Sequence, residues 1–202
     1  MMQKKAFAVL YMFILTAFFS AILIGISRGT RQRVMANERL AFEKAVLNVF
    51  PDLHYFSDQE AHALFEEKFQ PSPQAGGAYV YTRDGSIAGY AVPISGKGFW
   101  AKISGIIGIA PDRKTITGIS FYEQSETPGL GARIMEAEFY QQFAGKVMQP
   151  GPHPIVFRSP GQELSAGQVH AIAGATQTCV RLELFLNRDL QVWRQAVQEA
   201  KP

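Results

Sequence analysis

Hydrophobic residues are distributed along this chain in three different ways. An unbroken apolar run occupies residues 6–26, helical spacing of apolar residues marks residues 31–49 and the stretch after Thr178, and short strand-like runs bounded by Gly, Pro and Asp fill the middle. The run at 6–26 contains no charged residue and is long enough to cross a bilayer as a helix. The order of helices and strands predicts an α+β fold.

Two hairpins are predicted in the middle of the chain. The first has strands at 78–82 and 86–93 around an Asp-Gly turn, which is a favoured hairpin connection. The second has strands at 103–110 and 115–121. These pairs predict an antiparallel sheet with flanking helices. The remaining expected elements are short helices at 59–69 and 137–144, a loop at 71–77, and a strand at 154–157.

This pattern divides the chain into three parts. We expect a transmembrane anchor at 6–26, a helical linker region at 31–77 and one domain at 78–202. A cleavable signal peptide is the alternative for residues 6–26. Its apolar core would usually be shorter, about 7–15 residues, and a clear Ala-x-Ala cleavage site is missing, so a retained anchor is favoured.

Composition excludes several functional classes. The net charge of +3 comes partly from the flanks of the apolar run, and no basic block appears, so nucleic acid is not an expected partner. The four histidines lack metal-ligand spacing, and no metal site is predicted. Cys179 has no second cysteine to pair with, and its helical position predicts a buried packing residue. No nucleophile elbow surrounds Ser125, which excludes a hydrolytic triad there.

Residues 173–178 combine small side chains with two hydroxyls at the start of the last helix. Gly174 and Ala175 precede Thr176, and Thr178 follows in the first helical turn. Unpaired N–H groups and the positive end of the helix dipole favour an anion there, which predicts a phosphate site. The alternative is an ordinary helix cap made by one of the two hydroxyls.

A second segment, residues 126–131, contains a predicted tight turn. Pro128 and Gly129 suit its second and third positions, where the third requires a positive φ. Gly131 lets the backbone approach a neighbouring group closely. On its own, this pattern also fits a plain turn that closes a strand.

Together with residues 95–100, the two segments resemble a known family in order and spacing. They are similar to the FMN-binding subunits of ion-translocating respiratory complexes, represented by those of the sodium-pumping NADH:quinone oxidoreductase and of the Rnf electron-transport complex. The resemblance extends from the apolar run through the helix after Thr176. Residues 126–131 are its most specific part.

The resemblance implies that FMN is the cofactor and that the domain at 78–202 binds it. In the family, a flavin transferase that uses FAD as donor attaches FMN through a phosphoester to the last residue of Asp-x-x-Ser/Thr-Gly-Ala-Thr/Ser, which matches Thr176. His170 stands where the motif has Asp, and Ala173 stands where it has a hydroxyl residue. We expect both departures to weaken recognition by the transferase while the acceptor remains.

The resemblance also implies roles for the other site residues. Glu126 and Thr127 would contact polar atoms of the flavin, Leu130 would cover its ring, and the Thr178 hydroxyl would bond the attached phosphate or a backbone carbonyl. Trp100 either stacks on the flavin or belongs to the core. The backbone participants expected around the cofactor are Gly96, Gly98, Gly129, Gly131, Gly174 and Ala175.

The implied function is electron relay by a membrane-anchored flavoprotein rather than catalysis by a stand-alone enzyme. Its implied partners are other subunits of a membrane redox complex. The family places the domain on the periplasmic side of a bacterial inner membrane. The count of positive charges weakly favours the opposite orientation, because two lysines (Lys4, Lys5) precede the apolar run and three arginines (Arg28, Arg31, Arg33) follow it. Two alternatives remain: a flavin-free scaffold or sensor subunit of the same fold, and a noncovalent FMN binder.

Overall fold

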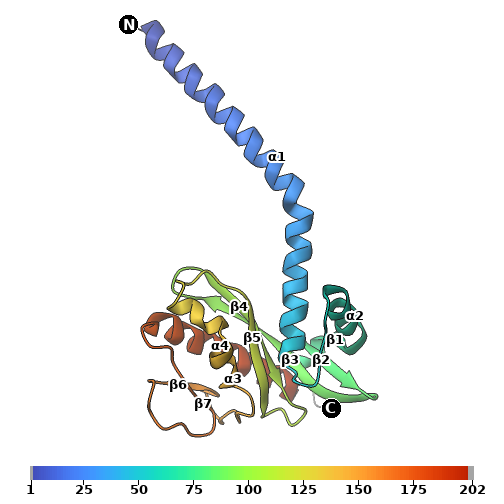
Figure 1. The fold of residues 1–202 in the computed structure, drawn as a ribbon. Coiled ribbons are helices and arrows are strands. Elements are labelled where there is room, and N and C mark those ends of the chain that lie inside the picture. Colours follow the sequence, from blue (N-terminus) through green and yellow to red (C-terminus); the bar gives the residue numbers. More distant parts are fainter. Residues whose placement is uncertain (1, 200–202) are drawn as a thin grey trace. The chain divides into compact units, whose positions relative to one another are not determined.

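The computed structural model describes residues 2–199, with side chains from residue 7 onward. Lys4 and Lys5 therefore lie outside the described side chains, and residues 200–202 of the predicted domain lie outside the described residues. The chain forms two compact units, Met1–Arg39 and Leu40–Pro202. Figure 1 shows the helices and strands of both units.

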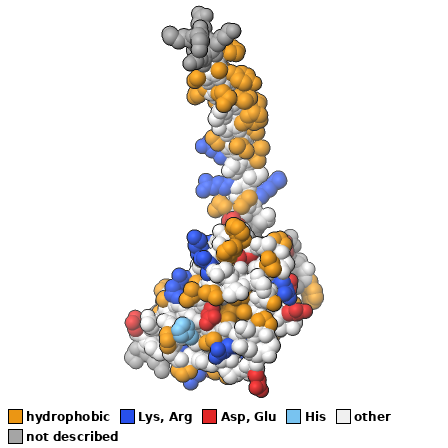
Figure 2. Space-filling view, turned by 90° about the vertical axis from the view of Figure 1, so that its left-hand side faces the viewer, with side chains coloured by type: hydrophobic (Ala, Val, Ile, Leu, Met, Phe, Trp, Pro, Cys, Tyr) orange, Lys and Arg blue, Asp and Glu red, His pale blue; other side chains and the backbone are white. Residues whose placement is uncertain are grey.

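The first unit belongs to a single long helix. Helix α1 runs over Met2–Asn48, so the apolar run and the helix expected at 31–49 form one continuous helix. No proline lies in this stretch, so no i to i−4 hydrogen bond has to be lost. The apolar side chains of its first part, from Phe7 to Met35, are exposed, as Figure 2 shows, and Phe13 and Leu23 are 70% and 67% exposed. By length and composition this helix can cross a membrane, although a signal sequence would pass the same test.

The second unit is built on a five-stranded antiparallel sheet in which strands adjacent in sequence are adjacent in space. This confirms the predicted α+β class with an antiparallel sheet and flanking helices. The strands are β1 (Phe69–Ser72), β2 (Ala78–Arg83), β3 (Ser86–Lys97), β4 (Lys102–Ile109) and β5 (Ile116–Glu123). A short parallel pair, β6 (Val156–Arg158) and β7 (Gln168–His170), lies outside this sheet.

Hydrophobic clusters cover both faces of the sheet, because side chains alternate along each strand. On β4, Ile107 and Ile109 belong to the cluster that includes helix α4 (Thr176–Glu199), while Ile106 faces the cluster of the last turns of α1 and helix α2 (Asp58–Lys68). Smaller elements complete the unit: the 3-10 turns η1 (Pro73–Ala75) and η2 (Gly131–Met135), and helix α3 (Ala137–Gln141).

Three strands differ clearly from expectation, and one of them, β7, was not predicted at all. Strand β1 occupies residues predicted as a helix end and a loop, and it is an edge strand, where Pro71 is tolerated. Strand β3 continues through Pro93 to Lys97, where it pairs with β4. Its pairing with β2 ends at Ala91, so the missing N–H of Pro93 costs no hydrogen bond to β2. The compact unit begins at Leu40. Residues 40–77, which include most of the predicted linker region, therefore pack with the sheet.

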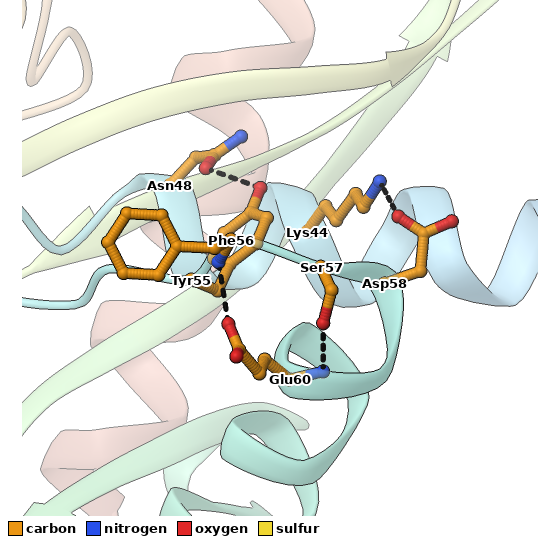
Figure 3. A network of polar contacts seen from close by, with 7 residues as sticks. All are labelled: Lys44, Asn48, Tyr55, Phe56, Ser57, Asp58 and Glu60. Carbon is orange, nitrogen blue, oxygen red and sulfur yellow. Dashed lines mark hydrogen bonds and ion pairs between the residues drawn. The ribbon is translucent and has the colours of Figure 1, made fainter.

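Polar contacts join α2 to the last turns of α1 (Figure 3). The Ser57 hydroxyl caps the helix by accepting a bond from Glu60 N at 3.2 Å, and the Glu60 carboxylate accepts one from Phe56 N, just before the cap, at 2.7 Å. Lys44 pairs with Asp58 at 2.6 Å. These contacts and the buried Phe65 fix α2 on this face of the sheet.

Candidate cofactor site

The two segments singled out in the sequence meet at one cavity of about 240 Å³, which we call the Thr176 cavity. The loop after β5 forms one wall, and the first turn of α4 forms the other. The structure therefore brings together residues fifty positions apart in the sequence. The lining residues are Phe99, Glu126, Thr127, Leu130, Gly131, Gly174, Ala175, Thr176, Gln177 and Thr178.

The first wall contains the expected tight turn. Leu130 N donates to Thr127 O at 3.1 Å, and Gly129 at the third position has φ +73°. A side chain there would be strained in this conformation, which explains the glycine. The turn places Leu130, which is 44% exposed, at the edge of the cavity.

The second wall begins with another turn. Ala175 N donates to Ile172 O at 3.1 Å, and Gly174 has φ +79°. A Cβ atom at Gly174 would lie 3.1 Å from Leu130 Cδ2, so the two loops approach each other here.

Helix α4 starts directly after this turn, and its first residues line the cavity. The Cys179 N–H is bonded to Ala175 O at 3.0 Å. The N–H groups of Thr176, Gln177 and Thr178 precede it, and they have no acceptor within the helix. All three residues line the cavity. Such a helix start attracts anions, and a phosphate fits it.

Glu126 joins three segments beneath the cavity. Its side chain is only 5% exposed. One carboxylate oxygen accepts a bond from the Thr178 hydroxyl at 2.6 Å, and the other accepts one from Trp100 N at 3.1 Å. A buried carboxylate is costly unless it is hydrogen-bonded, and these two bonds satisfy it.

This arrangement assigns different states to the two candidate hydroxyls. Thr178 is 4% exposed and donates to Glu126, rather than to a backbone carbonyl as one expectation had it. Thr176 is exposed on the cavity wall. Of these two threonines, Thr176 is therefore the one whose hydroxyl is accessible.

Glycine is required where the segments cross. A Cβ atom at Gly131 would lie 2.5 Å from Thr178 Oγ1 and 2.8 Å from a Glu126 carboxylate oxygen. At Gly98 it would lie 2.5 Å from the other Glu126 oxygen. All three distances are shorter than real Cβ atoms show, so these glycines let the backbone approach Glu126 closely.

The segment at 95–100 contributes differently from expectation. Trp100 is 64% exposed, so the core alternative is wrong, and its indole N–H donates to Thr127 Oγ1 at 3.0 Å. Gly96 and Gly98 are not among the lining residues, and Gly96 instead faces Phe185. The neighbouring Phe99 lines the cavity and was not singled out in the sequence. Its place beside Trp100 in the same motif is the signal that could have indicated it.

The two residues that depart from the family motif lie off the cavity wall. The His170 ring contacts Gln162 O at 2.8 Å, and its backbone N–H donates to Gln142 at 2.7 Å. Ala173 is exposed and lines a neighbouring depression. Cys179 is buried as predicted, and burial raises the pKa of its thiol, against a smaller opposing effect of the bond from Ile172 N.

One group of possible metal ligands appears elsewhere, although the sequence spacing predicted no such set. Ligand atoms of Glu43, His62 and Glu66 lie within 4.8 Å of one another. Glu43 is buried and contacts the His62 ring at 2.9 Å, and both glutamates have further interactions. Such groups are common without an ion, and this one is remote in sequence from the Thr176 cavity.

Comparisons with known proteins agree with this geometry. The model of the FMN-binding domain family matches residues 98–190. The NqrC subunit of the Na⁺-translocating NADH-quinone reductase from Neisseria meningitidis is 39% identical over 102 residues, which cover 49% of this chain and 39% of that protein. The corresponding subunit from Pasteurella multocida is 33% identical over 103 residues, which cover 50% of this chain and 40% of that protein. The match thus spans about two fifths of each relative.

A solved structure supports the fold. The crystal structure of the NqrC subunit of the Na⁺-translocating NADH-quinone reductase from Parabacteroides distasonis superposes with a TM-score of 0.69 at 23% identity, over 84% of this chain and 96% of that one. The resemblance stated from the sequence is confirmed, and so is FMN as the cofactor. Residues 98–190 thus match the FMN-binding domain family, and this part of the chain resembles the NqrC subunits of the Na⁺-translocating NADH-quinone reductases.

Proposed function

We propose that this protein is a membrane-anchored flavoprotein that carries FMN on Thr176 through a phosphoester and relays electrons within a membrane redox complex. The observation that supports this most directly is the contrast between the two hydroxyls of the cavity. Thr176 is exposed at its wall, whereas Thr178 is buried and bonded to Glu126.

Attachment at Thr176 is chemically simple. The Thr176 oxygen would form a bond to the FMN phosphorus, the pyrophosphate bond of FAD would break, and AMP would leave with the hydroxyl proton passing to a base of the flavin transferase. The small side chains of Gly174 and Ala175 leave this hydroxyl open. The N–H groups of the first turn of α4 would hold the phosphate oxygens.

FMN supplies the redox chemistry once it is bound, and the chain positions it. At about 240 Å³ the cavity is smaller than the roughly 300 Å³ at the lower end of drug-sized sites, so part of the flavin would extend over its rim. Phe99 and Leu130, which are 45% and 44% exposed there, would cover apolar surface of the ligand. Thr127 would contribute a polar contact beside them.

We further propose that α1 anchors the protein in a bacterial cytoplasmic membrane, with the domain on its outer side. The apolar, exposed first part of α1 supports the anchor. A covalent bond is useful outside the cytoplasm, where free FMN to refill an empty site is scarce, because the tether makes rebinding intramolecular. The names of the relatives support other membrane redox subunits as partners.

The decisive experiment compares Thr176→Val with Thr176→Ser in chains produced together with an FAD-dependent flavin transferase. Valine preserves the shape but removes the nucleophile, so we expect no covalent flavin, while serine retains the hydroxyl and most of the flavin. Thr178→Ser should also retain flavin. The measurement is flavin fluorescence on a denaturing gel, with peptide mass spectrometry to locate the FMN mass.

The same experiment separates the alternatives. An FMN mass on Thr178 would contradict the proposed attachment site. A yellow protein without gel fluorescence would indicate noncovalent FMN, and a colourless one would favour the scaffold subunit. If the departures at His170 and Ala173 impair the transferase, the His170→Asp and Ala173→Ser double variant should raise the flavinylated fraction. Absence of flavin even in that variant would refute covalent attachment.

A further inference from the structure

A second cavity lies near the other end of α4. It measures about 730 Å³ and has no lining residue in common with the Thr176 cavity. Small-molecule sites usually occupy about 300–1,000 Å³, so this volume is sufficient for a ligand. Trp193 follows Thr178 by fifteen residues on α4, which corresponds to roughly 22 Å along the helix. We call this space the Trp193 cavity.

The Trp193 cavity combines an apolar floor with a cationic rim. Met148, Trp193 and Val197 are buried at 4%, 1% and 7% exposure. The charged lining residues are Arg113, Lys114, Arg194 and Asp112.

Asp112, the acid among these lining residues, is already engaged. It accepts bonds from the N–H groups of Lys114 and Thr115, both at 2.8 Å, and from the Thr115 hydroxyl at 2.5 Å. Burial works against its ionisation, but these bonds and the nearby Lys114 ammonium still hold the pKa of Asp112 below its usual value. The described rim therefore presents an excess of positive charge to the cavity.

Arg113 occupies a backbone position that favours glycine. Its φ is +61°, in the left-handed region that is unfavourable for a residue with a side chain. Its side chain is held in place, because Nε donates to the Tyr90 hydroxyl at 3.4 Å and the guanidinium lies 5.8 Å from the centre of the Tyr90 ring. The turn between β4 and β5 accounts for this conformation, and the contacts with Tyr90 hold the guanidinium charge beside the cavity.

Arg194 adds a poorly solvated charge. One of its guanidinium nitrogens donates to Gln149 O at 2.9 Å, and the side chain is half-buried. Burial lowers the pKa of Arg194, which means that its charged form is less well stabilised than in water. An anion beside it would compensate for the lost solvation.

We propose that the Trp193 cavity binds a small organic anion. Its apolar body would lie against Met148, Trp193 and Val197, and its carboxylate, sulfonate or phosphate group would lie among the three cations of the rim. This proposal does not depend on the flavin chemistry of the Thr176 cavity.

The test uses two probes of nearly equal shape, 4-nitrobenzoate and its neutral analogue 4-nitrobenzamide, since nitroaromatics quench tryptophan on contact. The chain has two tryptophans, so the full-length Trp100→Phe variant in mild detergent leaves Trp193 as the reporter. We expect saturable quenching by the benzoate, at a concentration at least tenfold lower than for the amide. The benzoate affinity should fall as sodium chloride is raised.

Substitutions then locate the site. Arg113→Gly relieves the left-handed strain and so preserves the fold, and its combination with Arg194→Gln should raise the half-saturating benzoate concentration at least tenfold. Arg158→Gln, an exposed arginine of β6 that does not line the cavity, should leave it unchanged. If the double variant misfolds by circular dichroism, Arg113→Gly alone should still weaken binding several-fold. Equal quenching by the amide, absence of saturation, or indifference to Arg113→Gly would overturn the proposal.

Discussion

Glu126 is the residue on which the geometry of the Thr176 cavity depends most. Its two oxygens accept bonds from the loop at Trp100 and from the first turn of α4, so one buried side chain holds both walls in register. A contact of Glu126 with the flavin itself stays a prediction. Its observed bonds support a positioning role.

Glu126→Ala should therefore lower the free energy of unfolding by about 1–3 kcal/mol, because the Trp100 N–H and the Thr178 hydroxyl lose a buried acceptor. Glu126→Gln retains an oxygen and should lose less. Urea unfolding followed by tryptophan fluorescence measures both, and the flavin absorption spectrum reports the cavity. Equal stability of the alanine and wild-type chains would contradict the role assigned to this carboxylate.

Gly131 and Gly129 form a matched pair for a second prediction. Gly131→Val would drive a side chain into Thr178 and Glu126, whereas a Cβ at Gly129 meets nothing within 4 Å. Gly129→Ala should cost only the strain of its positive φ, about 1–2 kcal/mol. We expect Gly131→Val to abolish flavin incorporation while Gly129→Ala retains it, as judged by the flavin-to-protein ratio. Similar flavin content in both variants would exclude this crossing point from the site.

At the scale of elements, β4 and β5 are joined by a side-chain contact that responds to pH. The Ser104 hydroxyl donates to Glu123 at 2.7 Å, and Lys102 lies 3.3 Å from the same oxygen. The hydrogen bond from Ser104 lowers the pKa of Glu123 below its ordinary value of 4.5. Burial opposes this shift, and the Lys102 ammonium adds to it. The folded state therefore binds this proton less tightly than the unfolded state.

The stabilisation from Glu123 is consequently present above about pH 4.5 and is lost as the pH falls through the lowered value in the folded protein. Ser104→Ala should reduce the free energy of unfolding by about 0.5 kcal/mol at pH 7, since the glutamate is half-exposed, and by less at pH 3. Denaturant titrations at the two pH values measure this, with the exposed Ser125→Ala as control. An unchanged difference between the two pH values would refute the coupling.

Helix α4 connects the two cavities within the compact unit. Its first turn lines the Thr176 cavity, and Trp193, Arg194 and Val197 line the Trp193 cavity. The apolar stripe read from the sequence predicts the buried side of this helix correctly, because a spacing of three to four residues places side chains on one face. The edge strand β1 was not predicted, since Pro71 and the neighbouring small residues also fit a loop, and only pairing with β2 makes it a strand.

At the scale of the whole molecule, the anchor is the feature open to test. We expect the apolar first part of α1 to be retained, so that the protein stays with membranes after an alkaline carbonate wash, because its unbroken apolar length favours a spanning helix. Immunoblotting of the washed fractions and N-terminal sequencing provide the measurement. A soluble mature chain that begins near Arg28 would instead identify residues 6–26 as a signal peptide.

The sequence by itself determined the features that depend on local spacing: the apolar run, the hairpins, the last helix, the turn at Pro128-Gly129, and the motifs that indicate FMN. These follow from periodicity and turn chemistry over a few neighbouring residues. Only the tertiary structure decided that Thr178 is buried against Glu126 while Thr176 is exposed, and that Arg113 and Arg194 share a cavity. The physical reason is that burial and long-range hydrogen bonds arise from residues that the fold alone brings together.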